Sequence, residues 1–413
     1  MKLEGRYPEL HLTYCTNIHP GETWEDVFAN LQRHLPALKA RLAPDVPFGV
    51  GLRLANIAAA ELLQGDRLVQ FRQWLDRENL YVFTLNGFPY GSFHHQVVKD
   101  RVYAPDWTEV ERLEYTLRLT EILAALLPAD MDGGISTVPL SYKPWWSRSE
   151  DADTAFRSSS LNLARLALEM ARIERDSGTW LHVDLEPEPN GAIENASETV
   201  EFFQSWLLPV GGMWLAEQLG CSRQQAEALL LRHVNVCYDT CHFALEYEEP
   251  AEAIAHLQAA GIRIGKVQIS SALRVDMPTD IAARQTVVER LQPFAESTYL
   301  HQAIARQPDD TLSRYVDLDA ALPDLLSGDA VEWRIHFHVP IFLQDYQILQ
   351  STQDHISGVI ELLGDRFSCH HLEIETYTWD VLPAAMKQDI QLSIQREYEW
   401  VLEALSHEQS LAA

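Results

Sequence analysis

The 413-residue sequence is short of positive charge: it has 32 lysines and arginines, 60 aspartates and glutamates, and a formal net charge of −28. Binding to nucleic acid depends on clustered Lys and Arg side chains that neutralise phosphates, so this imbalance argues against a nucleic-acid partner. It equally disfavours an anionic membrane surface. Because the sequence also lacks an apolar run of 18 residues and an apolar amino-terminal segment, we expect no membrane insertion and a cytoplasmic protein.

Cysteine is scarce as well, and the five cysteines form no CxxC pair, so neither a disulfide framework nor a zinc knuckle is indicated. Cys237 and Cys241 flank an Asp-Thr pair, and we expect them on neighbouring walls of the core rather than on a metal. The sequence has no glycine-rich loop of the Walker or Rossmann type, which argues against a nucleotide cofactor. With 46% hydrophobic and 22% charged residues, the composition is that of an ordinary globular protein.

Apolar periodicity predicts strands that alternate with helices, many of 15 or more residues, the pattern of βαβ units and a parallel sheet. Eight such units suit a (β/α)8 TIM barrel, and 1–413 is most simply one domain, without repeat or linker. Nine strand-like segments are present, so one lies outside the barrel. We favour 331–338, within an inserted segment near 271–340 and packed against the seventh strand, although the opposite assignment stays open. The nine segments are 10–15, 47–54, 80–85, 134–139, 179–185, 234–239, 264–270, 331–338 and 372–377.

The stretch 234–242 combines a buried strand with chemistry at its end, since Asp239 closes the strand and His242 follows three residues later. Polar residues at the carboxyl ends of parallel strands face the mouth of an α/β fold, where ligands bind. A carboxylate and an imidazole in one pocket suit a divalent metal or a polyol. The alternative is structural: Asp239 caps a turn and His242 bonds to the backbone.

Other strand ends carry residues of the same type: Glu186 after the fifth strand, Gln268 in the seventh, and Glu373 and Glu375 in the last. Glu375 lies nearer the mouth and is the preferred ligand of that pair. Carboxylates that converge at one mouth repel each other unless a cation neutralises them, which predicts a metal site containing Asp239 as well. The mixed oxygen and nitrogen donors suit Mn²⁺, Zn²⁺, Mg²⁺ or Co²⁺.

His336 and His338 share one face of their strand, so one of them could be a ligand; a histidine hydrogen-bonded at a strand edge is the alternative. Weaker candidates for the mouth are loop histidines, polar substrate contacts and aromatic residues that could stack on a sugar face. They are His94, His95, Asn86, Lys99, Trp145, Trp146 and Trp379.

A Glu after strand five, Asp-Thr-x-His at strand six and a Glu on the last strand resemble the xylose-isomerase-like TIM-barrel superfamily, which includes sugar isomerases, ketose 3-epimerases and nucleases of the AP-endonuclease-2 type. Longer strings are similar to the EboE family of metabolite-traffic proteins. These are Leu85-Asn86-Gly87-Phe88-Pro89-Tyr90-Gly91, Val102-Tyr103-Ala104-Pro105-Asp106-Trp107, Val138-Pro139-Leu140-Ser141-Tyr142-Lys143 and Glu373-Ile374-Glu375-Thr376-Tyr377-Thr378-Trp379.

The resemblance implies that Glu186, Asp239 and Glu375 are metal ligands and that the two glutamates also move the substrate proton. It implies that His242 holds a substrate oxygen. The superfamily has a histidine on strand seven where this chain has Gln268, a weaker ligand, and His338 could supply the missing imidazole. The Asp-x-His of the nuclease members is only partly matched, which argues against nuclease activity.

Two main hypotheses follow. The first is a metal-dependent isomerase or epimerase that acts on a sugar- or cyclitol-like polyol, with proton transfer next to a metal-bound carbonyl or hydroxyl. The second is a non-catalytic trafficking protein that binds a metabolite in the same barrel but has lost its metal chemistry, which the departure at Gln268 suggests. A multi-metal hydrolase or oxygenase is a third possibility, left open by His94, His242 and His338.

Overall fold

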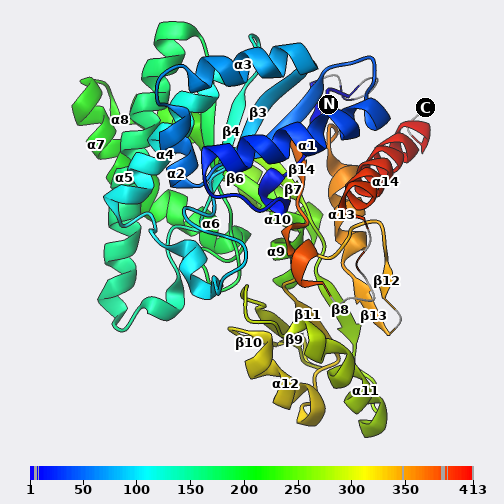
Figure 1. The fold of residues 1–413 in the computed structure, drawn as a ribbon. Coiled ribbons are helices and arrows are strands. Elements are labelled where there is room, and N and C mark those ends of the chain that lie inside the picture. Colours follow the sequence, from blue (N-terminus) through cyan, green and yellow to red (C-terminus); the bar gives the residue numbers. More distant parts are fainter. Residues whose placement is uncertain (4–6, 8, 347, 383–386, 388, 412–413) are drawn as a thin grey trace.

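The fold is a (β/α)8 barrel, as predicted, in a computed structural model that describes residues 1–3, 7, 9–346, 348–382, 387 and 389–411. Its eight strands are parallel and follow the order β1-β14-β7-β6-β5-β4-β3-β2 (Figure 1). A bridge between Cys15 and Gly51 joins β1 to β2, so the barrel is nearly closed. The strands are β1 (His11–Tyr14), β2 (Phe48–Arg53), β3 (Leu80–Asn86), β4 (Gly133–Thr137), β5 (Leu181–Leu185), β6 (Val234–Asp239), β7 (Ile264–Ile269) and β14 (His371–Ile374).

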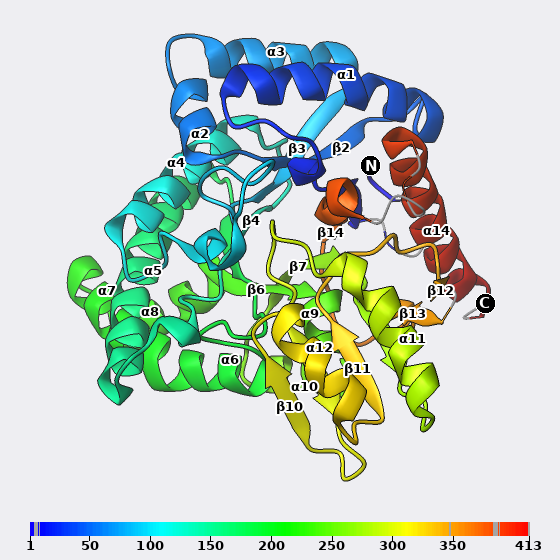
Figure 2. The ribbon, with the colours of Figure 1, turned by 60° about the horizontal axis from the view of Figure 1, so that its bottom comes forward.

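Helices surround the barrel (Figure 2). They are α1 (Trp24–Leu42), α2 (Asn56–Leu62), α3 (Arg67–Glu78), α4 (Val110–Leu126), α5 (Ser149–Ser177), α6 (Ala196–Phe202), α7 (Gly212–Leu219), α8 (Arg223–His233), α9 (Thr240–Leu245), α10 (Pro250–Ala259), α13 (Gln353–Leu362) and α14 (Ile390–Leu411). A π-helical segment, Phe203–Gly211, joins α6 to α7. Short 3-10 turns lie at Thr16–Ile18, Lys99–Tyr103, Lys143–Trp145, Gln292–Phe294 and Tyr377–Val381.

A second, antiparallel sheet is inserted between β7 and α13 and extends away from the barrel (Figure 1). Its strands are β8 (Leu273–Asp276), β9 (Ala303–Arg306), β10 (Leu312–Tyr315), β11 (Glu332–Ile335), β12 (Asp345–Tyr346) and β13 (Leu349–Ser351), with helices α11 (Ile281–Leu291) and α12 (Leu318–Ser327). The insertion therefore extends beyond the predicted residue 340. The segment 331–338 does lie outside the barrel, because its strand β11 pairs with β8 and β9 of the second sheet.

The inside of the barrel is unusually polar. Along β5, Leu181, Val183 and Leu185 belong to the apolar core, whereas the side chains of His182 and Asp184, which are also buried, alternate with them. Farther round, Lys266 of β7 and Glu373 of β14 form a fully buried ion pair of 2.5 Å. Burial alone would lower the pKa of Lys266, but Glu373 outweighs it and the pKa is raised.

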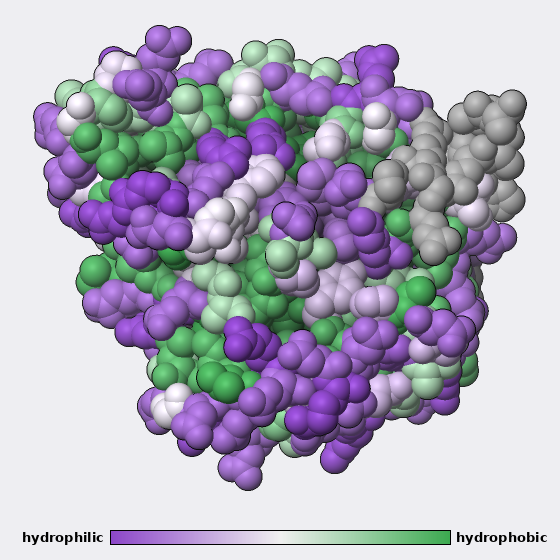
Figure 3. All heavy atoms as spheres, turned by 90° about the horizontal axis from the view of Figure 1, so that it is seen from above, coloured by the Kyte–Doolittle hydropathy of each residue, from purple (hydrophilic) through white to green (hydrophobic). Residues whose placement is uncertain are grey.

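Among the described residues, no helix is long and apolar enough to cross a membrane. Hydrophilic and hydrophobic side chains are mixed over the face of the molecule seen from above (Figure 3).

Candidate metal centre

Three of the predicted ligands meet at the carboxyl ends of the barrel strands. Asp239 ends β6, while Glu186 and Glu375 directly follow β5 and β14. Each side chain offers an oxygen within 4.8 Å of an oxygen of the other two, and all three residues are buried. Residues far apart in the sequence thus share one centre because parallel strands present their carboxyl ends at one mouth.

The two oxygens of Asp239 have different surroundings. Oδ1 accepts hydrogen bonds from the backbone N–H groups of Cys241 and His242, at 2.8 and 3.1 Å, and from the Ser270 hydroxyl at 2.5 Å. Oδ2 is buried without a hydrogen-bond partner, as is Oε2 of Glu186. Asp239 therefore caps α9 with one oxygen and leaves the other for a ligand, so both interpretations of this residue describe part of its geometry.

Glu375 is held by two amides, since its Oε1 accepts from Asn17 Nδ2 at 2.7 Å and Asn86 Nδ2 at 2.8 Å. Asn86, considered above as a substrate contact, is thus one of the groups that orient Glu375. Gln268 is fully buried beside Glu375, yet neither of its side-chain polar atoms completes a regular hydrogen bond. The Gln268 amide therefore lies where it could act as a weak, neutral metal ligand.

Packing these acids together is costly in the absence of a cation. Burial, followed by the charges of Glu375 and Asp239, raises the pKa of Glu186 well above its usual range. Burial and then Asp239 raise the pKa of Glu375 to about 8. A divalent ion would remove this repulsion and let the carboxylates ionise, which is the electrostatic argument for a metal.

Three histidines face the same centre with their Nε2 atoms. The Nδ1–H of His242 donates to the Pro187 carbonyl at 3.1 Å, and that of His338 donates to the Glu375 carbonyl at 2.9 Å. His336 donates from Nδ1 to Gln302 Oε1 at 2.7 Å. These acceptors fix the tautomer of a neutral imidazole, whose Nε2 then carries a lone pair.

The resulting contacts are unfavourable without a cation. The Nε2 of His336 lies 3.3 Å from that of His242 and 3.2 Å from that of His338. Burial lowers the pKa of His338 to about 4 and that of His336 well below its usual range, so both imidazoles are neutral at neutral pH. Neutral nitrogen atoms that face each other with lone pairs cannot hydrogen-bond, but they can share a metal ion.

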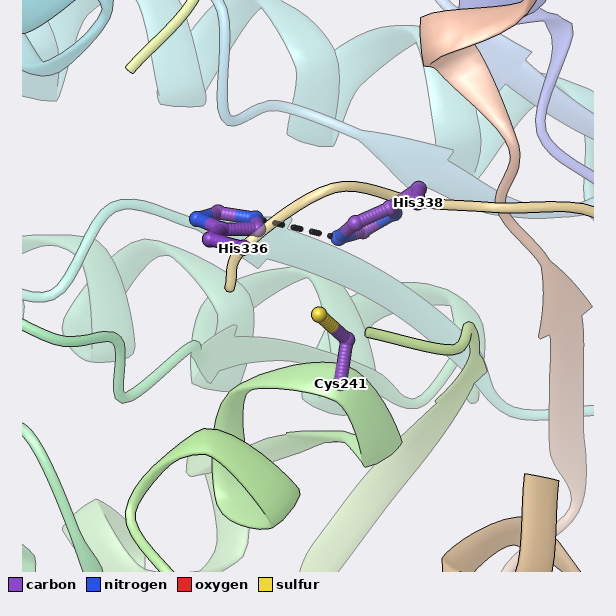
Figure 4. Close-up of side chains that lie close together, drawn as sticks. All are labelled: Cys241, His336 and His338. Atoms are coloured by element: carbon purple, nitrogen blue, oxygen red, sulfur yellow. Dashed lines mark hydrogen bonds between the residues drawn. The ribbon is translucent and has the colours of Figure 1, made fainter. Parts of the chain in front are cut away.

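Cys241 lies beside this group, with its Sγ within 4.8 Å of ligand nitrogens of His336 and His338 (Figure 4). It also packs with Leu245, Ala272 and Ile304 in a small buried cluster. The expected place in the core is thus correct, but the thiol borders the mouth as well. Burial and then Asp239 raise its pKa well above the usual value, which keeps it a thiol in the absence of a metal.

Glu188 is the residue that the sequence interpretation missed. It is buried, its Oε1 accepts from Gln302 at 3.1 Å, and its Oε2 has no partner. It offers an oxygen within 4.8 Å of ligand nitrogens of His242 and His336. The repeated acid in Glu186-Pro187-Glu188 was the available signal.

The pocket above these residues has aromatic walls, but not those that the sequence suggested. Phe88, Phe93, Tyr299 and Tyr377 line it, whereas Trp145, Trp146, Trp379 and His94 do not. Trp145 instead donates to Asp100 at 2.8 Å. Tyr299, His336 and His338 come from the inserted segment, so the insertion completes the site.

The donor set fits a divalent metal ion. It combines carboxylate oxygens with neutral imidazole nitrogens, and two of the carboxylates keep an oxygen without a partner. Glu186, Asp239, Glu375 and His338 would hold the ion, with Gln268 beside them. Mg²⁺ and Mn²⁺ suit the carboxylates, and Zn²⁺ or Co²⁺ suit the histidines.

No protein-family model and no curated protein sequence matches this chain. Solved structures match along most of its length. A xylose isomerase-like TIM barrel protein from Mycobacterium smegmatis in complex with magnesium is 11% identical (98% of this chain and 99% of that chain, TM-score 0.49). The IOLI protein with a binding zinc atom is 12% identical (97% and 99%, TM-score 0.47), and the probable 3-DHS dehydratase AsbF from Bacillus anthracis is 10% identical (95% and 99%, TM-score 0.40).

At these identities and TM-scores the likeness supports no conclusion about this chain. The ions and reactions named for these proteins are theirs.

Proposed function

We propose that this protein is a metal-dependent enzyme of the isomerase or epimerase kind that moves a proton next to a carbonyl or hydroxyl of a polyol or cyclitol-like substrate. The observation that carries the proposal is the meeting of Glu186, Asp239 and Glu375 at one buried centre with unpartnered carboxylate oxygens. A divalent ion bound there would polarise a substrate carbonyl and so acidify the adjacent C–H.

The two glutamates are suited to general acid–base catalysis. Glu186 presents an oxygen without a hydrogen bond, ready to accept a proton, whereas two asparagine amides fix the orientation of Glu375. One glutamate removes the proton and the other returns it. His242 lies beside Glu186, with its Nδ1 3.6 Å from Glu186 Oε1, and its other ring nitrogen, Nε2, could accept a hydrogen bond from a substrate hydroxyl.

The lining of the pocket favours an uncharged substrate. Within the described chain, Lys99 is the one lysine or arginine that lines it, and Lys99 is paired with Asp317 at 2.6 Å. A phosphate would therefore meet acids and aromatic rings rather than free cations. Aromatic walls over a polar floor suit the apolar face and the hydroxyls of a neutral polyol.

We further infer membership in the EboE family and a place in a biosynthetic or metabolite-traffic pathway in the cytoplasm. This finer proposal is supported by the way in which the motif strings contribute to the mouth. Asn86 and Glu375, from two different strings, hydrogen-bond to each other, and Tyr377 lines the pocket.

The test is solvent deuterium uptake. Unphosphorylated ketohexoses and cyclic keto-polyols are incubated in deuterium oxide with the protein and Mn²⁺, Mg²⁺, Zn²⁺ or Co²⁺, and label next to the carbonyl is measured by mass spectrometry. We expect Glu186→Gln and Glu375→Gln to lose at least ~10²-fold in uptake. Glu121→Gln, at an exposed position, is the matched control. Undiminished uptake in both variants would rule out the proton-transfer role.

A non-catalytic metabolite-binding protein is the alternative, and metal analysis separates the two. Near-stoichiometric metal at the mouth favours the enzyme. A mouth that stays empty after incubation with each of the four metal ions favours the binding protein, because the glutamates would then lack the ion that acidifies the substrate.

A multi-metal hydrolase or oxygenase is a second candidate function, favoured by the three facing Nε2 atoms and by Glu188. This group could hold an ion next to the carboxylate centre, as two-metal hydrolases require. More than one metal equivalent lost on His242→Asn and Asp239→Asn together would support it.

A further inference from the structure

The opposite, amino-terminal end of the barrel carries a second group of potential ligands, made of Asp132, His182 and His371. Asp132 immediately precedes β4, His182 lies in β5, and His371 begins β14. Each offers a ligand atom within 4.8 Å of the others. His182 and His371 precede Glu186 and Glu375 by four residues on the same two strands, which places this group about 13 Å below the mouth at 3.3 Å per residue.

The two imidazoles lie side by side and present the same edge to Asp132. Their ring centroids are 5.4 Å apart, and their planes differ by 25°. His182 Nε2 is 3.5 Å from Asp132 Oδ2, and His371 Nε2 is 3.8 Å from Asp132 Oδ1. A tetrahedral ion with bonds of 2.0–2.1 Å places its ligand atoms about 3.3 Å apart, so small shifts would complete the coordination.

A further carboxylate, that of Asp184, contacts the His182 imidazole on the side away from Asp132. Its Oδ1 accepts from His182 Nδ1 at 2.7 Å, which directs the Nε2 lone pair of His182 toward Asp132. This is the arrangement in which a carboxylate orients and polarises a metal-binding histidine. The other oxygen of Asp184, Oδ2, is buried and has no hydrogen-bond partner.

In His371, one ring nitrogen has no hydrogen-bond partner. Its Nε2–H donates to the Asp132 carbonyl at 3.2 Å, so Nδ1 is unprotonated, and Nδ1 is buried without a partner. A Cβ atom on Gly134 would lie 2.7 Å from Asp184 Oδ2 and 2.9 Å from His371 Nδ1, so these two unpartnered atoms border the same space. If Nε2 bound a metal, the proton would move to Nδ1 and could reach Asp184 Oδ2 directly or through one water molecule.

We propose that Asp132, His182 and His371 form a second metal site, of the zinc type, that clips β14 to β4 and β5 across the amino-terminal end of the barrel. Two imidazoles and a carboxylate leave a fourth position for water, as at open zinc sites. His370, partly exposed, lies 2.9 Å from Asp132 Oδ1 and gives the site a side toward solvent.

The competing account needs no metal. Burial alone would lower the pKa of His182, but Asp184 and Asp132 raise it to about 9, so His182 could remain a cation between two carboxylates. That account leaves Nδ1 of His371 and Oδ2 of Asp184 without partners, whereas metal binding would place a proton on Nδ1, beside the space that Oδ2 borders.

Zinc stoichiometry distinguishes the accounts. The full chain is stripped with chelator, reloaded with Zn²⁺, separated from excess ion and analysed for metal. We expect His182→Asn, His371→Asn and the double variant each to hold one equivalent less than the wild type, and Zn²⁺ to raise the midpoint of thermal unfolding less in each. His11→Asn, a change at a buried histidine that bonds to Tyr81 instead, should keep the full count.

Wild-type counts in both single variants would overturn the proposal. Should either fail to fold by circular dichroism, Asp132→Asn, which keeps the size of the side chain, gives the same readout. The outcome is independent of the proposed function, because an empty mouth would lower the wild-type count without removing the difference caused by His371→Asn.

Discussion

The two ends of the barrel are built on the same two strands yet differ in charge balance. From the second residue of β5 to the residue after it, the sequence is His182-Val183-Asp184-Leu185-Glu186, and β14 with the next residue is His371-Leu372-Glu373-Ile374-Glu375. In each run a histidine, an acid and a glutamate alternate with apolar residues of the core. The histidines lie at the amino end, the glutamates at the mouth, and the middle acids between them.

The difference shows how one strand pattern can serve two purposes. At the mouth, buried carboxylates outnumber cationic side chains, and some of their oxygens have no hydrogen-bond partner. These carboxylates can therefore bind a metal ion and take part in proton transfer. At the amino end, each acid has an imidazole beside it: His182 lies 2.7 Å from Asp184 and 3.5 Å from Asp132. This fits the general division of such barrels, with chemistry at the carboxyl face and stability at the other.

Asp239→Asn should separate the two ends most sharply. The variant keeps the size of the side chain and can still cap α9, but it removes a negative ligand from the mouth. We expect deuterium uptake to fall at least ~10³-fold, beyond the loss of a single general base. The zinc difference between Asp239→Asn and Asp239→Asn/His371→Asn should remain one equivalent, because well-separated sites act independently. A difference near zero would mean that the ends are one coupled system.

Lys266→Met tests the layer between the ends. It leaves Glu373 as an uncompensated buried charge and should cost about 3–5 kcal/mol of unfolding free energy. Lys266→Met/Glu373→Leu should recover most of that loss, since an apolar pair of similar volume removes the buried charge. Urea denaturation measures both. Equal stability of Lys266→Met and the wild type would show that the layer does not depend on this ion pair.

The barrel could be predicted because its signals are local: apolar strands recur between long helices, and the acids at their ends can be read one strand at a time. Glu186, Asp239 and Glu375 follow from that rule. The pairing of β11 could not be predicted, since Val331 to His338 has the same local pattern whether it joins the barrel or a second sheet.

The rest of the site depends on contacts between distant segments. Nothing near Gln302 in the sequence reveals that it fixes the tautomer of His336, nor that Asn17 holds Glu375. The sequence did not predict the amino-end group, because Asp132, His182 and His371 lie far apart along the chain. Only the repeated alternation of histidine and acid in β5 and β14 could have pointed to it.

Asp184→Asn tests whether the carboxylate behind His182 contributes to zinc affinity at the amino end. The change leaves the proposed zinc ligands in place but weakens the acceptor behind His182. Loss of such a supporting carboxylate typically lowers metal affinity 10- to 100-fold. Competition with a zinc-binding dye measures it, and the metal count at the mouth serves as the internal control. Unchanged affinity would separate Asp184 from metal binding.

The smallest predicted effect lies beside the mouth, where Glu397 of α14 extends the excess of buried acid. Its Oε1 accepts from the Thr376 hydroxyl at 2.7 Å, next to Glu375, and burial raises its pKa to about 7. The unfolded chain releases this proton near pH 4.5, so the wild type loses stability as pH rises from there to about 7. Glu397→Gln has no such proton to lose.

Relative to the wild type, Glu397→Gln should therefore gain about 2 kcal/mol of unfolding free energy between pH 5 and pH 8, whatever its offset at pH 5. Urea denaturation at several pH values measures the slope, and Glu121→Gln, at an exposed position, should show none. A flat difference for Glu397→Gln would mean that Glu397 is ionised in the folded protein. The acid-rich character of the mouth would then stop at its metal ligands, and the contrast with the balanced amino end would rest on those ligands alone.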